Sequence, residues 1–351
     1  MKKYILILLT MFAGIAFADS AIDGLALALN PNGETLVAAG DNRTIYSIDA
    51  NSLEVIGRTY FGSTINKMAY SPDGSVLYVQ DSEPNIYILD AETFETKSKL
   101  AGYGMMQISN EAQRLVAINL DYGGDTLAVF DISENKLNSL AEVSFDKDDD
   151  ISSMGINAAG TQVAIFFDDV DSETEEKVSW SDIPDEYKGF EKDIYSEQHD
   201  GKEARFLLLS TPELDVLADY VSFYTPYSKE FVFFQGDDVL ITSSNNENAR
   251  YKLNGDVEMW EWDGVSSSYA EAVSADHSVL VVGGYAEGTI YNVENASGFS
   301  FELDDIPGAS EYFTDFAVAA DGSVYGTTTG YRIAKVKLAG AGISKTIKPV
   351  Y

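Results

Sequence analysis

The chain has 351 residues and no cysteine, so it has neither a disulfide framework nor a thiolate metal site. Acidic residues number 57 against 23 basic ones, and the formal net charge at pH 7 is −34. This charge argues against nucleic acid and anionic lipid as partners, because both would be repelled. It permits cationic partners and divalent cations, and it is also the charge of a surface adapted only for solubility.

Residues 1–18 have the pattern of a secretory signal peptide. Lys2 and Lys3 precede an apolar run, and Ala16-Phe17-Ala18 has the small-x-small form of a cleavage site. A membrane anchor is the alternative, but the apolar run is short for a span. We therefore expect a mature chain that begins at Asp19, has a net charge of −36 and keeps no transmembrane anchor. The expected location is a bacterial periplasm or the extracellular medium.

Short strand-like runs follow the leader. The first unit covers residues 22–61, with strands expected at 26–29, 35–39, 44–48 and 54–60. The second unit, residues 65–100, is the clearest, because four runs rich in β-branched and aromatic residues are each bounded by Pro, Gly, Asp or Asn. Its Ser71-Pro72-Asp73-Gly74 segment has the chemistry of a turn between the first and second strands. Each unit is therefore expected to be a four-stranded antiparallel meander.

Two independent signals recur along the chain with a period near forty residues. The third strand of a unit is expected to end in an apolar residue followed by a polar or charged one, at Asp49, Asp90, Asp131, Thr211, Asn254, Glu294 and Lys337. The intervals between these positions are 41, 41, 80, 43, 40 and 43 residues. The turn signal recurs at 30–33, 71–74, 157–160 and 320–322, with degenerate copies at 109–112, 235–238 and 274–277. Both signals predict seven units.

A period of this length with four strands per unit is the signature of a β-propeller blade. The units resemble the YVTN and WD-type repeats of seven-bladed β-propellers. We therefore expect an all-β protein in which residues 19–351 form a single seven-bladed propeller of four-stranded antiparallel blades. No terminal strand is left over to complete a blade from the other end, so the first and last blades are expected to meet through side-chain packing. The resemblance implies an architecture and not a function, because this fold hosts binding scaffolds and unrelated enzymes.

A cluster of acidic residues follows the third unit, which covers residues 105–143. Asp146, Asp148 and Asp150 are so close in sequence that their carboxylates repel one another unless they are solvated or bridged by a cation. Calcium is the candidate cation, although the Gly and the terminal Glu of an EF-hand loop are missing. Surface charge alone is the alternative interpretation.

The doubled interval falls in the fourth unit. Its second and third strands are expected at 161–167 and 204–209, and residues 168–203 form an acidic insertion between them. The insertion has no strand periodicity, whereas Ser181-Asp182-Ile183-Pro184 resembles the start of a helix. We expect an insertion with a short helix and not an eighth blade.

Aromatic residues gather in the linkers between units, of which the last three cover residues 231–263, 269–303 and 313–350. The resemblance implies that these linkers and the loops between second and third strands emerge on one face, together with the insertion and the acidic cluster. Tyrosine and tryptophan are favoured at recognition surfaces, although they can equally wedge neighbouring blades together. The candidate binding residues are Tyr60, Tyr103, Trp180, Tyr187, Tyr224, Tyr227, Tyr269 and Tyr312.

Enzymatic signals are few. His199 lies in the polar insertion and His277 in a turn, and there is neither a Gly-x-Ser-x-Gly elbow nor a phosphate-binding loop before a helix. We expect an exported, non-catalytic binding or scaffold protein that needs no cofactor. Tyrosine-rich linkers beside an acidic insertion suit a basic, apolar or sugar-bearing ligand, and the expected partner is a protein or peptide of basic character. The alternatives are a lactonase-like propeller hydrolase, with a carboxylate or calcium site at the mouth of the channel, and a purely structural envelope component.

Overall fold

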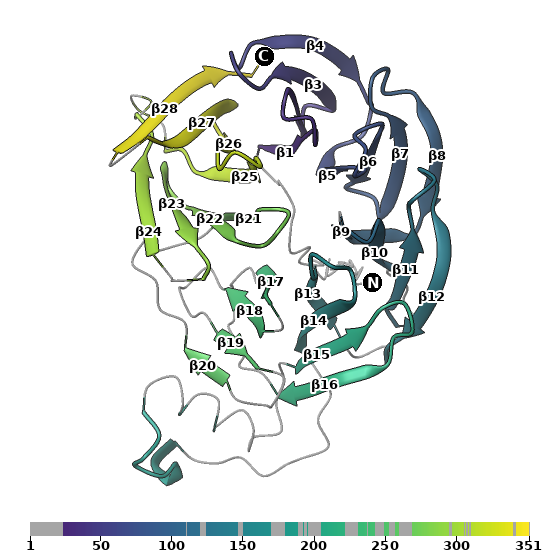
Figure 1. Cartoon of the computed structure of the whole chain (residues 1–351), viewed down its shortest axis with the longest axis vertical. Coiled ribbons are helices and arrows are strands. Elements are labelled where there is room, and N and C mark those ends of the chain that lie inside the picture. The colour runs from purple at the N-terminus through teal and green to yellow at the C-terminus, as the bar shows by residue number, and fades with distance from the viewer. Residues whose placement is uncertain are drawn as a thin grey trace, which may run out of the picture.

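The computed structural model describes residues 24–109, 111–119, 124–146, 150–169, 180–188, 192, 195, 205–221, 231–236, 238–242, 249–252, 257–259, 269–294, 297–304, 306, 308, 310–339 and 342–350. Within these residues, seven four-stranded antiparallel sheets stand as blades around a central axis (Figure 1). The predicted seven-bladed β-propeller is confirmed. Each blade consists of four consecutive strands, with the first strand innermost and the fourth at the rim.

In blade 1, and in the second and third strands of blade 4, the strands begin and end within two residues of the predicted positions. Blade 1 consists of β1 (Leu25–Leu29), β2 (Thr35–Gly40), β3 (Thr44–Asp49) and β4 (Val55–Tyr60). Blade 2 consists of β5 (Ile65–Tyr70), β6 (Val76–Asp81), β7 (Asn85–Asp90) and β8 (Thr96–Ala101). Blade 3 consists of β9 (Tyr103–Ser109), β10 (Arg114–Asn119), β11 (Thr126–Asp131) and β12 (Asn138–Ser144). Blade 4 consists of β13 (Asp150–Ile156), β14 (Gln162–Asp169), β15 (Arg205–Ser210) and β16 (Val216–Val221).

The last three blades complete the ring. Blade 5 consists of β17 (Phe231–Gln235), β18 (Asp238–Thr242), β19 (Ala249–Tyr251) and β20 (Val257–Met259). Blade 6 consists of β21 (Ala270–Val273), β22 (Val279–Gly283), β23 (Glu287–Asn292) and β24 (Ser297–Glu302). Blade 7 consists of β25 (Phe313–Val318), β26 (Val324–Thr328), β27 (Arg332–Ala339) and β28 (Gly342–Pro349). Most of the predicted insertion, residues 168–203, lies outside the described residues, and its described part contains the short 3₁₀ helix η1 (Trp180–Asp182).

The turn between the first and second strands contains a residue with positive φ in every blade. These residues are Gly33, Gly74, Gln113, Gly160, Gly236, His277 and Gly322, with φ between 52° and 76°. Glycine adopts this left-handed conformation without steric cost, which explains why it recurs in the turn signal. Two of the three degenerate turns have a residue other than glycine at this position, Gln113 and His277, whereas the third has Gly236. Each predicted turn therefore lies at or next to a residue with positive φ.

Side-chain bonds explain how one degenerate turn keeps its shape. In blade 2 the Ser71 hydroxyl donates to Asp73 Oδ1 at 2.7 Å, and the same oxygen accepts from the Ser75 amide at 3.0 Å. In blade 6 the Ser274 hydroxyl donates to Asp276 Oδ1 at 2.6 Å, and that oxygen accepts from a following amide at 3.1 Å. The Ser-x-Asp arrangement therefore specifies the turn even where histidine replaces glycine.

The predicted end of the third strand is right in blade 1 and blade 2 and wrong in blade 7. Asp49 Oδ1 accepts from the amides of Asn51 and Ser52, and Asp90 Oδ1 binds the amides after it in the same way, so the carboxylate closes the turn. Lys337 stands at this position in blade 7 and cannot accept a hydrogen bond from an amide. There β27 continues to Ala339.

Apolar side chains pack between blades. The described residues form seven hydrophobic clusters, and each is shared by two neighbouring blades, including one that joins blade 7 to blade 1. All six residues of β6 are buried, because neighbouring blades cover both of its faces. The rim strand β4 alternates between half-buried and exposed residues. Burial against both neighbours therefore holds the ring together.

The ring closes without an exchanged strand, as the sequence predicted. β1 and β25 lie side by side, and the Leu27 amide donates to Asp315 Oδ2 at 2.7 Å. The hydroxyl of Thr327 donates to the Leu25 carbonyl at 2.6 Å. Nearer the rim, Tyr325 OH donates to the Ala50 carbonyl at 3.1 Å. Side-chain bonds and the shared hydrophobic cluster together make this seam.

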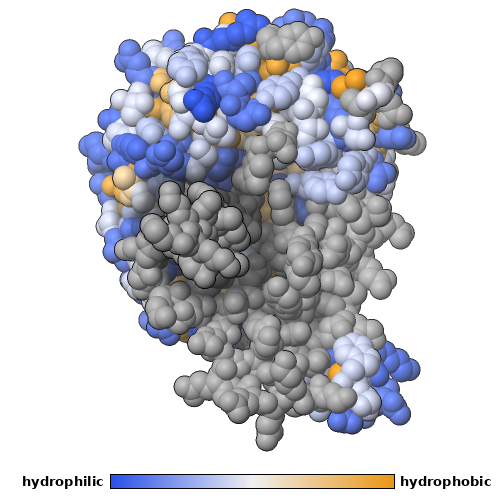
Figure 2. Space-filling view, turned by 180° about the vertical axis from the view of Figure 1, so that it is seen from behind, coloured by the Kyte–Doolittle hydropathy of each residue, from blue (hydrophilic) through white to orange (hydrophobic). Residues whose placement is uncertain are grey.

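The surface agrees with the acidic composition. Over the described residues, the face in Figure 2 is mainly hydrophilic, and hydrophobic residues on it are scattered singly or in small groups. No helix within the described residues is long and apolar enough to cross a membrane.

Candidate functional site

The antiparallel order of the strands defines two faces of the ring. The chain reverses at each strand, so the loops between second and third strands emerge on the same face as the linkers between blades. We call this face the linker face. Binding residues concentrate on loops that a rigid scaffold holds in place. The candidate site is therefore expected on this face.

Three tyrosines from separate loops meet on the linker face, and we call them the tyrosine cluster. Tyr269 precedes β21, Tyr285 lies between β22 and β23, and Tyr312 precedes β25. The ring centroid of Tyr269 lies 5.1 Å from that of Tyr285 and 5.2 Å from that of Tyr312, and the hydroxyl of Tyr269 donates to that of Tyr285 at 3.1 Å. The side chain of Tyr285 is 57% exposed. The cluster is therefore a packed aromatic surface that is open to solvent at Tyr285.

A groove of about 380 Å³ adjoins the tyrosine cluster, and we call it the linker-face groove. Blade 1 contributes Asp41, blade 7 contributes Thr329 and Tyr331, and the linker before blade 7 contributes Tyr312. Tyr312 thus belongs to both the cluster and the groove. The Tyr331 hydroxyl donates to Asp41 Oδ1 across the seam between blades 7 and 1.

Buried polar contacts make the floor of this groove rigid. Glu311 is only 5% exposed, and its carboxylate accepts from the guanidinium of Arg332 and the hydroxyl of Thr328. The amide of Thr329 donates to the Tyr312 carbonyl at 3.0 Å, and the Thr329 hydroxyl accepts from the Tyr312 amide at 3.2 Å. These bonds hold Tyr312 in place before any ligand arrives. Such preorganisation reduces the ordering that binding would require.

Two other candidate residues differ in their surroundings. Tyr60, at the end of β4, is 73% exposed, as expected of a contact residue. Tyr103 is buried, and its ring packs edge to face on Phe130 of the same blade, with centroids 5.7 Å apart. Tyr103 also belongs to the hydrophobic cluster that blades 2 and 3 share, which is the position that the wedge interpretation describes.

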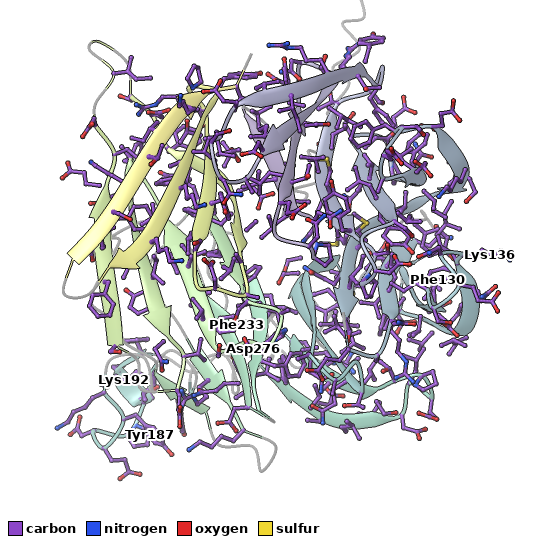
Figure 3. All side chains as sticks on the ribbon, turned by 45° about the horizontal axis from the view of Figure 1, so that its top comes forward. Phe130, Lys136, Tyr187, Lys192, Phe233 and Asp276 are labelled. Carbon is purple, nitrogen blue, oxygen red and sulfur yellow. The ribbon has the colours of Figure 1, made fainter. Side chains whose placement is uncertain are left out.

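The candidates in the insertion are Trp180 and Tyr187. Tyr187 and Lys192 are at the edge of the molecule, outside the ring (Figure 3), and Tyr187 packs against Tyr195 with centroids 4.7 Å apart. Trp180 is 54% exposed, and Lys192 Nζ lies 6.0 Å from the centroid of its ring. Tyr224 and Tyr227 lie outside the described residues.

The predicted calcium cluster is only partly described. Asp148 lies outside the described residues, and Asp150 is described as the first residue of β13 without its side chain. Among the described residues there is no group of three or more His, Asp or Glu side chains that could hold a metal ion. The calcium site thus stays a prediction.

The central channel holds a cavity of about 310 Å³ lined by the first strands of all seven blades. Lys67, Glu271 and Asp315 bring charge to it, and Tyr269 places the tyrosine cluster at its mouth. The Asp315 carboxylate accepts from the amides of Leu27 and Phe316, so it stabilises the seam between blades 7 and 1. The channel wall is therefore partly charged. One of its carboxylates, that of Asp315, has a structural role at the seam.

One buried carboxyl, that of Asp81, has a raised pKa. Asp81, at the end of β6, is 2% exposed, and burial raises its pKa above the ordinary value, partly offset by hydrogen bonds. Asn85 Nδ2 donates to its Oδ1 at 3.0 Å, and the Ser63 hydroxyl donates to its Oδ2 at 3.3 Å. These bonds tie the loop between β6 and β7 to the preceding linker. The carboxyl therefore has a structural use in this loop.

Asp41, Tyr285 and Tyr331 were not among the binding residues predicted from the sequence. All three lie in loops between second and third strands, which emerge on the same face as the linkers. Extending the search for aromatic and acidic residues from the linkers to these loops would have found them.

Comparison with known proteins assigns no family to the chain. The chain matches no family model and no curated protein sequence. The relationship shown is the fold, a seven-bladed β-propeller.

Proposed function

We propose that this protein is an exported, non-catalytic binding protein that recognises a basic protein or peptide through its linker face. The observation that supports the proposal is the exposed tyrosine cluster beside a preorganised groove, on a protein with a net charge of −34. Aromatic side chains supply much contact area at low entropic cost, and the overall charge favours cationic partners.

The proposal includes the finer predictions from the sequence. Residues 1–18 would be removed on export, the location would be the periplasm or the medium, and the blades would be YVTN-like or WD-like repeats. Neither a transmembrane anchor nor a cofactor would be needed. The lactonase-like hydrolase with a carboxylate or calcium site stays a sequence-based alternative.

The test uses the mature protein, residues 19–351, immobilised for selection of random peptides displayed on phage. We expect the selected peptides to be rich in Arg and Lys and to bind Tyr285→Ala about tenfold more weakly than the wild type, because exposed aromatic anchors contribute most of the binding energy at such surfaces. The matched control is Leu140→Ala, which removes another exposed apolar side chain, in the rim strand β12. Equal affinity for the wild type and Tyr285→Ala would contradict the proposal.

A deletion tests the role of the insertion. Replacing residues 172–202 by a short Gly-Ser linker is expected to preserve cooperative unfolding, because the paired strands β14 and β15 lie outside the deleted segment. We expect peptide binding to be lost or strongly weakened, which calorimetry would measure. Full binding by the folded deletion variant would contradict the predicted role of the insertion in binding.

A further inference from the structure

The linker-face groove has a chemistry that the general proposal does not specify. Two tyrosines, Tyr312 and Tyr331, stand in its wall, and Asp41 stands at its blade 1 side. None of the described residues that line it is basic, whereas two of them are acidic. The charge of the second acid, Glu311, is already matched by Arg332. The carboxylate that the groove presents to a ligand is therefore that of Asp41.

Asp41 retains acceptor capacity although it already has a partner. Its side chain is exposed, and one of its oxygens accepts from the Tyr331 hydroxyl. An ionised carboxylate offers about four lone-pair sites, so the second oxygen and the remaining lone pair of the first can accept further bonds. The bond to Tyr331 also fixes the orientation of both groups.

An arginine side chain matches these features better than a lysine side chain. The guanidinium group is planar, pairs with a carboxylate through two parallel hydrogen bonds and stacks on aromatic rings. A lysine ammonium is a compact, strongly hydrated charge. Because it is not planar, it can neither pair with a carboxylate through two parallel hydrogen bonds nor stack on an aromatic ring. A cavity of about 380 Å³ has room for such a side chain with part of its backbone.

We propose that the linker-face groove binds an arginine side chain of a partner peptide, with the guanidinium paired to Asp41 and packed against Tyr312 and Tyr331. This inference rests on the proposed function and names the group that the linker face recognises. The groove lies across the seam between blades 7 and 1, so the arginine would contact the last blade and the first.

The experiment titrates the mature protein with the peptide acetyl-Gly-Arg-Gly-amide by isothermal titration calorimetry. The matched ligand contains citrulline, which has nearly the shape of arginine without its charge. We expect the arginine peptide to bind at least tenfold more tightly than the citrulline peptide, and its affinity to fall as NaCl is raised. A lysine peptide is expected to bind more weakly than the arginine peptide.

Variants assign the effect to the groove. Asp41→Asn keeps the shape of the side chain and is expected to weaken arginine binding about tenfold, with an unchanged thermal unfolding curve showing that the fold is intact. The matched control is Glu134→Gln, which removes one exposed negative charge from blade 3. The control is expected to bind arginine as the wild type does.

Three results would overturn the inference: no arginine binding at millimolar concentration, equal binding of the citrulline peptide, or equal affinities of Asp41→Asn and Glu134→Gln. Binding of methyl glucoside that depends on Asp41 would instead assign the groove to a sugar. A selected peptide that depends on Tyr285 but not on Asp41 would overturn the arginine site and leave the proposed function standing. The two proposals can therefore fail separately.

Discussion

His277 occupies a turn position where five other blades have glycine, and it takes the left-handed conformation with a φ of 57°. Its Nδ1 lies 3.3 Å from the Phe234 amide nitrogen and 3.2 Å from the Phe234 carbonyl oxygen, so the side chain links blade 6 to blade 5. Burial lowers the pKa of His277 below its usual value of 6.5, and the contact with Phe234 and the charges of Asp276 and Glu111 offset this only in part. The sequence analysis interpreted this residue as a turn residue, and the structure adds the contact between blades.

The lowered pKa of His277 predicts that the free energy of unfolding depends on pH. The folded protein keeps His277 neutral below pH 6.5, whereas the unfolded chain binds a proton there, so stability present above pH 6.5 is lost as the pH falls. We expect the free energy of unfolding of the wild type to fall more than that of His277→Gly between pH 7 and pH 5. Glycine suits the left-handed turn and does not titrate.

Urea unfolding at both pH values measures the difference, and the variant provides the control for the many carboxylates that also titrate. Identical pH profiles for the two proteins would mean that His277 takes up a proton equally easily in the folded and unfolded states.

Some neighbouring strands approach each other closely at a glycine, where no side chain stands between them. A Cβ atom on Gly155 of β13 would lie 2.3 Å from the carbonyl oxygen of Val232 in β17, a contact that backbone atoms cannot relieve without moving the strands. Gly40 at the end of β2 has a similar relation to the backbone of Gly24. These glycines set the distance between adjacent strands, and no local signal marks them in the sequence.

We expect Gly155→Ala to lower the free energy of unfolding by about 1–3 kcal/mol, because the added methyl group must displace β13 or β17. The control is Gly57→Ala in the rim strand β4, where the nearest atom to the new Cβ is a serine hydroxyl at 3.4 Å. The control is expected to change stability by less than about 0.5 kcal/mol. Urea unfolding of both variants measures the effect, and a Gly155→Ala variant as stable as the control would show that the two strands can separate without cost.

The whole molecule has to fold against its own charge, since 57 acidic residues face 23 basic ones. Several basic residues are already paired, among them Lys345 with Asp304 at 2.9 Å and Lys348 with Glu54 at 2.7 Å. The second pair joins blade 7 to blade 1. Repulsion between the remaining carboxylates opposes the compact state and is screened by salt.

We expect the melting temperature of the mature protein to rise by a few degrees between 10 mM and 300 mM NaCl, because screening reduces the repulsion in the folded state. At matched ionic strength, calcium and magnesium are expected to give equal shifts if the acids act only as surface charge. Differential scanning calorimetry with and without EDTA measures both effects. A large shift with calcium alone, reversed by EDTA, would indicate a specific site and favour the cluster of Asp146, Asp148 and Asp150.

Local chemistry was enough to predict the architecture. A turn such as Ser71-Pro72-Asp73-Gly74 is specified by residues that bond to one another within five positions, so its recurrence counts the blades directly. The same locality explains the error in blade 7, where Lys337 lacks the carboxylate that closes the turn in blades 1 and 2 and the strand runs on to Ala339.

The candidate site depends on contacts that no local pattern encodes. Asp41 and Tyr331 are 290 residues apart in the chain and meet only because the ring closes between blades 7 and 1. Tyr103 and Tyr312 were both predicted to lie in linkers. In the structure Tyr103 begins β9 and is buried in the cluster between blades 2 and 3, whereas Tyr312 joins an exposed cluster. Strand periodicity reports which face of a strand is buried, and it carries no information on which loops become neighbours. The number of blades could therefore be predicted from the sequence, whereas the residues that make up the candidate site were decided by the packing of the closed ring.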